Sequence, residues 1–120
     1  MAQKAAAVGT VTHHGMVIFD FDTGSYAPGS GSGDWKVRPI PWPIFPSPPS
    51  LGQVLIEFDV PITGPYTVII SAGRTPDCPM LSANWGNLSA NGFEVVLFDP
   101  VATLSYRTVR NGNFSFAVIQ

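Results

Sequence analysis

The sequence predicts an all-β protein, an antiparallel β-sandwich of about six to seven strands. The chain has 12 Gly and 12 Pro among 120 residues, which argues against long helices. Between these residues stand short runs rich in β-branched and aromatic side chains, which suit pleated, half-buried surfaces. Several runs alternate apolar and polar residues, the period of a strand with one face in a core. A single domain of this length buries one core without further support.

The first part of the chain predicts an arm, a strand and a loop. Residues 1–15 carry small residues and little pattern, so we expect an extended N-terminal arm before a single domain over residues 16–120. Residues 16–22 (MVIFDFD) alternate as a strand, with Val17, Phe19 and Phe21 on one face and Asp20 and Asp22 on the other. Glycine and serine dominate residues 24–34, which predict a surface loop.

A short strand over residues 35–40 then leads into a proline-rich segment. Residues 39–50 (PIPWPIFPSPPS) hold six prolines, which lack the N–H group that a central strand needs. We interpret this segment as an extended strap whose apolar side chains press on a neighbouring surface. A proline-rich motif for a signalling domain is the alternative.

The rest of the chain predicts the remaining strands and their connections. Asn111 and Gly112 form the strongest hairpin signal, because both tolerate positive φ. Residues 73–91 are interpreted as a long polar connection with a short strand near Met80. The expected strands are residues 53–60, 66–73, 92–99, 102–108 and 113–119.

A hard break interrupts the most apolar part of the chain, VLIEFDVPITGPYTVIIS. Pro61, Gly64 and Pro65 separate two strand-like runs. Proline prevents pairing at the corner and Gly64 permits unusual φ, so we expect the ribbon to leave one sheet here and enter the other.

Composition narrows the function classes. The net charge of −2 and the absence of a basic patch argue against nucleic-acid binding. Cys78, the only cysteine, excludes an intramolecular disulfide and a cysteine-based zinc site, and we expect it to be a small buried side chain. No secretory signal or membrane span is visible, which predicts a protein made in the cytoplasm, without membrane insertion. Only 12% of residues are charged, which suggests that other subunits cover part of the surface.

Catalytic patterns are scarce, and we expect no enzyme, no cofactor and no metal. His13 and His14 are adjacent, so on a strand they point in opposite directions. We therefore expect one packed and one exposed side chain, or two exposed ones, and no metal site. Asp20 and Asp22 share a strand face; calcium binding or glycosidase chemistry is conceivable, but a solvated face is the simpler origin. The motifs of serine hydrolases, P-loop proteins and zinc proteases are absent.

Residues 53–120 resemble the H-type lectin domains and the related C-terminal, receptor-binding domains of phage tail fibres. The resemblance rests on IEFDVPITGPYTVIISAG, on LSANGFEVVLFD and on NGNFSFAVIQ. Phe116 stands where that family has Trp, and the segment 39–50 has no counterpart in it. The resemblance implies a β-sandwich, a homotrimer, and a sugar site at a subunit boundary near the ends of late strands.

The candidate glycan site combines an aromatic residue with amides. An aromatic ring packs on the apolar face of a sugar while amides satisfy its hydroxyls. The alternative is that Trp85 closes the end of the sandwich and the asparagines make turns. The residues predicted to bind glycan are Asn84, Trp85, Asn87, Tyr106, Arg107 and Asn111.

The leading hypothesis is a non-catalytic, lectin-like virion protein of a phage tail or tail tip, which binds host-cell surface carbohydrate as a homotrimer. Its main rival is a structural capsid decoration or tail-assembly protein that contacts other virion proteins and binds no glycan. A small cellular lectin is a third interpretation.

Overall fold

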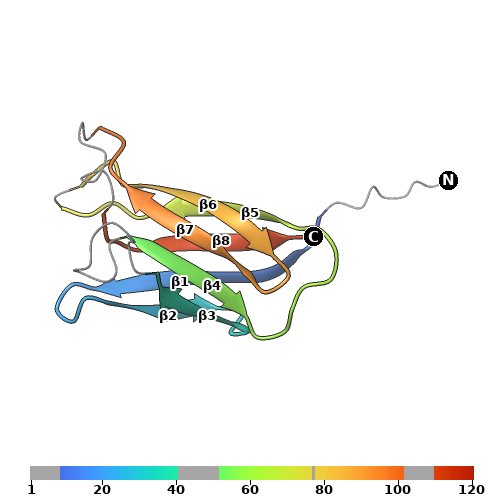
Figure 1. Ribbon diagram of the computed structural model, residues 1–120. Coiled ribbons are helices and arrows are strands. Elements are labelled where there is room, and N and C mark those ends of the chain that lie inside the picture. Colours follow the sequence, from blue (N-terminus) through green and yellow to red (C-terminus); the bar gives the residue numbers. More distant parts are fainter. Residues whose placement is uncertain (1–8, 41–51, 77, 102–109) are drawn as a thin grey trace.

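The protein is a two-layer β-sandwich, seen in a computed structural model that describes residues 9–40, 52–76, 78–101 and 110–120 (Figure 1). Within these residues there are eight strands and no helix, so the predicted all-β antiparallel sandwich is confirmed. Sheet A contains, in spatial order, β2 (Ser25–Gly31), β1 (Val11–Asp20), β8 (Phe114–Ile119) and β5 (Thr67–Ala72). Sheet B contains β3 (Trp35–Pro39), β4 (Gln53–Phe58), β7 (Gly92–Phe98) and β6 (Ser82–Ser89).

The core lies between the two sheets and follows directly from the alternating pattern. Every second residue of β4, β7 and β8 is buried, because successive side chains of a strand point to opposite faces. The side chains that these three strands bury are Val54, Ile56, Phe58, Phe93, Val95, Leu97, Phe114, Phe116 and Val118.

Aromatic rings join the two layers. Phe116 of sheet A meets Trp35 of sheet B with ring centroids 4.9 Å apart, and it meets Phe93 at 5.4 Å. The Trp35 indole N–H donates to the carbonyl oxygen of His14 at 3.0 Å. A Cβ atom on Gly15 would lie 2.0 Å from the Trp35 ring, so glycine is needed here to let the indole pack against β1.

The chain crosses between the layers at the predicted break. β4 belongs to sheet B and β5 to sheet A, and residues 59–66 connect them at the end of the sandwich where the C-terminus lies (Figure 1). Gly64 has a φ of 84°, which glycine adopts without steric cost. The expectation that the ribbon changes sheets here is confirmed.

The first 15 residues are not all an arm, because β1 begins at Val11. Its first half pairs with β8, although the sequence there (VTHHG) has little apolar pattern. Backbone pairing along β8 therefore extends the strand beyond what its side chains predict. Asp20 ends β1, and its carboxylate accepts hydrogen bonds from the backbone N–H groups of Asp22 and Thr23, so the two aspartates form a turn and Phe21 is exposed.

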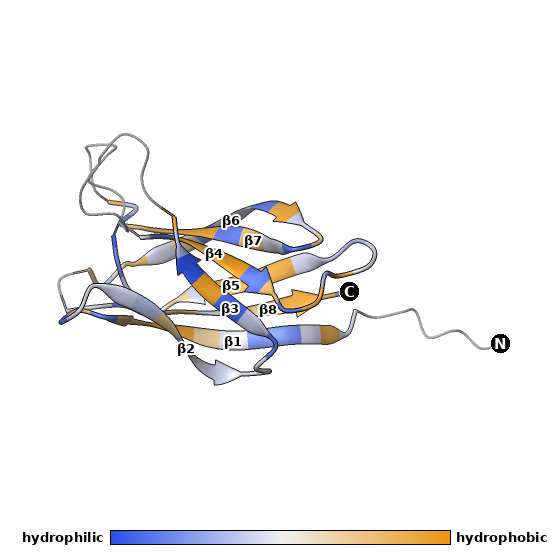
Figure 2. Ribbon diagram, turned by 60° about the horizontal axis from the view of Figure 1, so that its bottom comes forward, coloured by the Kyte–Doolittle hydropathy of each residue, from blue (hydrophilic) through white to orange (hydrophobic). Residues whose placement is uncertain are grey.

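Residues 24–34, predicted as a surface loop, contain strand β2, so that prediction is wrong. Residues 73–91, predicted as a polar connection with a short strand near Met80, contain the eight-residue strand β6, which begins at Ser82. β2 pairs with β1 and β6 pairs with β7, each at the edge of its sheet. An edge strand needs hydrogen bonds on one side only, which is why β2 tolerates Pro28 and why weak patterns still pair. Figure 2 shows β2 mostly pale, without the strongly apolar residues that mark a central strand.

The predicted hairpin turn at Asn111 and Gly112 is also wrong. Both edges of β8 are occupied, by β1 and by β5, so no edge remains for a hairpin partner. Neither residue has a positive φ, since Asn87 is the only non-glycine with one among the described residues. The predicted strand 102–108 and most of the predicted strap, residues 41–50, lie outside the described part of the chain.

Candidate functional site

The two outer faces of the sandwich differ sharply in charge. On sheet A the outward positions along residues 14–18, 67–71 and 115–119 include no Asp, Glu, Lys or Arg, and Asp20 at the end of β1 is the charged residue on this side of the strand. Met16, Ile18 and Ile69 are between 36% and 59% exposed on this face. The outer face of sheet A is therefore defined by His14, Met16, Ile18, Thr67, Ile69, Ser71, Ser115, Ala117 and Ile119.

The outer face of sheet B is an ordinary solvent-facing surface. Arg38 of β3 donates through two nitrogens to the Glu57 carboxylate of β4, both at 3.2 Å, and this lowers the pKa of Glu57. Lys36 pairs with Asp59 at 2.5 Å, and this pairing raises the pKa of Lys36. Exposed pairs such as these add little to stability. Their value is diagnostic, because they mark which face meets water.

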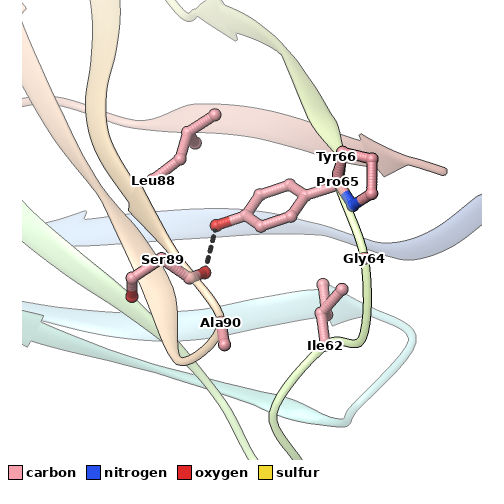
Figure 3. Close-up of a pocket in the computed structure, with 7 residues that line it drawn as sticks. All are labelled: Ile62, Gly64, Pro65, Tyr66, Leu88, Ser89 and Ala90. Carbon is pink, nitrogen blue, oxygen red and sulfur yellow. Dashed lines mark hydrogen bonds between the residues drawn. The ribbon is translucent and has the colours of Figure 1, made fainter.

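A shallow pocket of about 370 Å³ opens at the end of the sandwich, between the sheet-to-sheet crossover and the turn that joins β6 to β7. Figure 3 shows the Tyr66 ring reaching from the crossover toward the carbonyl oxygen of Ser89. The Tyr66 hydroxyl lies 2.7 Å from that oxygen and 2.8 Å from the carbonyl oxygen of Gly92, and burial raises its pKa. The lining residues are Ile62, Gly64, Pro65, Tyr66, Leu88, Ser89 and Ala90.

The chemistry of this pocket is mainly apolar. The Tyr66 hydroxyl donates to the Ser89 carbonyl oxygen. The Ser89 hydroxyl donates to the Gly92 carbonyl oxygen and accepts from the Asn91 N–H. The Phe58 and Tyr66 rings pack edge to face, with centroids 5.6 Å apart. The walls thus offer ring and aliphatic surface to a ligand, with few side-chain hydrogen-bonding groups. Sequence reasoning missed the pocket, although the Gly64–Pro65–Tyr66 break was the signal for it.

The structure does not gather the predicted glycan residues into one site. Asn84 and Trp85 are neighbours on β6 and so project from opposite faces of it. Trp85 is 43% exposed, so it does not close the end of the sandwich. Asn87 adopts a φ of 51° at an irregularity of β6 and donates to the Glu94 carboxylate at 2.9 Å. Tyr106 and Arg107 lie outside the described residues.

Asn111 lies at the opposite end of the sandwich from the pocket and ties the two sheets together there. Its side-chain oxygen accepts hydrogen bonds from the Gly52 backbone N–H at 2.6 Å and from the Tyr26 hydroxyl at 2.9 Å. Gly52 precedes β4 of sheet B, whereas Tyr26 belongs to β2 of sheet A. Burial raises the pKa of Tyr26, which keeps this hydroxyl a neutral donor.

The remaining candidates have structural surroundings. The His13 ring packs on Phe58, with centroids 4.6 Å apart, and its Nε2 lies 3.4 Å from the Asp34 carboxylate, whereas His14 is exposed. Cys78 is buried, as predicted. Across the described ranges, no three His, Cys, Asp or Glu side chains are grouped to hold a metal ion. Over the same ranges, no helix has the length and apolar character to cross a membrane.

Comparison of the chain with family models, with curated proteins and with solved structures gives no match.

Proposed function

We propose that this chain is a non-catalytic structural module of a phage virion, which docks on other virion proteins through the outer face of sheet A. The observation that carries the proposal is the outer face of sheet A, which is uncharged except for Asp20 at the end of β1, beside the charged outer face of sheet B. Water-facing sheets normally alternate apolar inward with polar outward, and contiguous exposed apolar patches mark interaction sites. The likeness of residues 53–120 to phage tail-fibre domains supports the virion setting.

The test places a charge on the proposed docking face. Ile18→Lys is expected to lower incorporation of the chain into particles by about tenfold or more, because a lysine buried at an interface loses its hydration. Incorporation is measured by quantitative mass spectrometry of purified virions. Leu55→Lys, at a half-buried outward position of sheet B, is the matched control and is expected to incorporate normally. Absence of the wild-type chain from virions, or equal incorporation of both variants, contradicts the proposal.

A tail-tip module that binds host glycan is the second candidate, and the pocket beside Tyr66 favours it. The rings of Tyr66 and Pro65 form a wall of the kind on which the C–H face of a sugar packs. The exposed Trp85 offers a second aromatic surface.

On this candidate, Ala90→Trp is expected to abolish binding on a glycan array, because the indole fills the pocket that Ala90 lines. Trp85→Ala tests the predicted site on β6 in the same assay. Met80→Ala, an exposed residue outside the pocket, is the control and is expected to bind like wild type. Failure of the folded wild-type protein to bind any glycan excludes this candidate and leaves the docking proposal untouched.

A further inference from the structure

The four edge strands of the sandwich are not equally protected against pairing with another chain. Exposed edges are normally protected by charge, proline or a bulge. β3 carries Lys36, Arg38 and Pro39, and β2 carries Pro28 among its glycines. β6 is irregular between Gly86 and Ser89. β5, with the sequence TVIISA, has no charge, no proline, no glycine and a regular register against β8.

The open backbone groups of β5 follow from its pairing with β8. The Gly73 N–H donates to the Asn113 carbonyl oxygen at 2.9 Å, in the same register as the ladder. Hydrogen bonds alternate along an antiparallel pair, so Thr67, Ile69 and Ser71 bond toward β8. The N–H and C=O groups of Val68, Ile70 and Ala72 therefore point away from sheet A. No described strand pairs with that side of β5.

Trp85 lies on the same side of the molecule as the open edge of β5. It pairs in register with Val95, which is fully buried, so its side chain projects from the inner face of sheet B. β6 is the outermost strand of that sheet and runs alongside β5 (Figure 1). Trp85 nevertheless remains 43% exposed, at the open side of the sandwich. Tryptophan is enriched among the residues that dominate binding at protein interfaces.

We propose that two copies of this chain associate by antiparallel pairing of β5 with β5, which joins their A sheets into one continuous sheet with Trp85 beside the seam. A two-fold axis at Ile70 sets Val68 opposite Ala72 of the partner subunit, so each outward-pointing group meets its complement. The strand is uncharged, and identical strands therefore meet without like charges facing each other. The contact uses the backbone edge of β5, whereas the proposed docking uses the outward side chains of sheet A; Ile69 belongs to both, and Ala72→Pro tests the edge alone.

The size of this contact sets the expected affinity. The six residues of β5 span about 20 Å along the contact, and the two sheets make the contacting side of the sandwich about as wide. Each copy therefore buries about 400 Å². A standard stable interface buries about 800 Å² per partner. We therefore expect a dissociation constant in the micromolar range, and measurements must cover it.

The experiment is sedimentation velocity of the full chain between about 1 and 200 µM. Wild type is expected to shift from monomer to dimer over this range. Ile69→Lys places a charge on the edge strand, and Ala72→Pro removes an N–H that points to the open side; each is expected to raise the dissociation constant at least about tenfold. Leu55→Lys and Ile18→Lys, on strands away from this edge, are expected to leave it unchanged. Circular dichroism confirms that each variant is folded.

Four outcomes overturn the pairing. The first is a monomer at every concentration, and the second is a dimer that persists in both Ile69→Lys and Ala72→Pro. The third is the homotrimer that the lectin-like resemblance implies, because a two-fold strand pair closes at two copies. Loss of the dimer in Ile18→Lys as well would also contradict it, since the contact would then involve the outer face.

Discussion

Phe93→Ala is expected to lower the free energy of unfolding by about 3–5 kcal/mol, the usual cost of removing a fully buried phenylalanine. The Phe93 side chain is completely buried on β7, which lies between β4 and β6. Its ring meets Phe58 at 6.0 Å and Phe116 at 5.4 Å, so it joins the crossover end of sheet B to the centre of sheet A. Removing it opens a cavity that neither rigid sheet can close.

Urea unfolding followed by tryptophan fluorescence measures this loss. A domain of this size has about 5–15 kcal/mol in total, so the variant is expected to unfold at a much lower urea concentration. Phe21→Ala is the matched control, because Phe21 is 63% exposed, and it is expected to cost less than about 1 kcal/mol. A loss below about 1 kcal/mol in Phe93→Ala contradicts the packing described for the core.

Asn111→Ala is expected to cost about 2–4 kcal/mol, because it leaves two donors without their acceptor at a buried position. The Gly52 N–H and the Tyr26 hydroxyl both bond the Asn111 side-chain oxygen, and both residues are buried. The loss also separates the start of β4 from β2 at that end of the sandwich.

A double-mutant cycle with Tyr26→Phe checks the assignment. The Tyr26 hydroxyl donates to Asn111 and accepts from the Gly112 N–H at 3.3 Å, so Tyr26→Phe has a cost of its own. Both variants lose the same Tyr26–Asn111 hydrogen bond, so the two changes together are expected to cost less than the sum of the single changes. Asn111→Asp keeps an acceptor oxygen and is expected to restore part of the stability. Strict additivity, or full stability in Asn111→Ala, contradicts the structural role of this side chain.

The strands that the sequence predicted well are those with a strong apolar face. β4, β7 and β8 begin and end within about two residues of their predicted bounds, because their alternating side chains must enter one core. β2 was missed, and β6 was expected only as a short strand near Met80, because small and polar residues dominate both. They form strands because β1 and β7 each offer them an edge to pair with. The local sequence does not show that such a neighbouring edge exists.

The candidate site shows the same division. None of the predicted residues Asn84, Trp85 and Asn87 lines the pocket, to which this segment contributes Leu88, Ser89 and Ala90. Composition could not show that Asn84 and Trp85 project from opposite faces, because that follows only once β6 is known to be a strand. Asn111 has the residue type of a turn, yet its position next to Gly52 and Tyr26 makes it a link between sheets.

By itself, the amino-acid sequence determined that the chain is a β-sandwich and that it changes sheets at Pro61–Pro65, because alternation and chain breakers act through neighbouring residues. Only the tertiary structure decided which face lacks charge, which edge is unprotected and where the pocket lies. Those properties arise when strands distant in sequence lie side by side, and no local pattern of side chains specifies that arrangement.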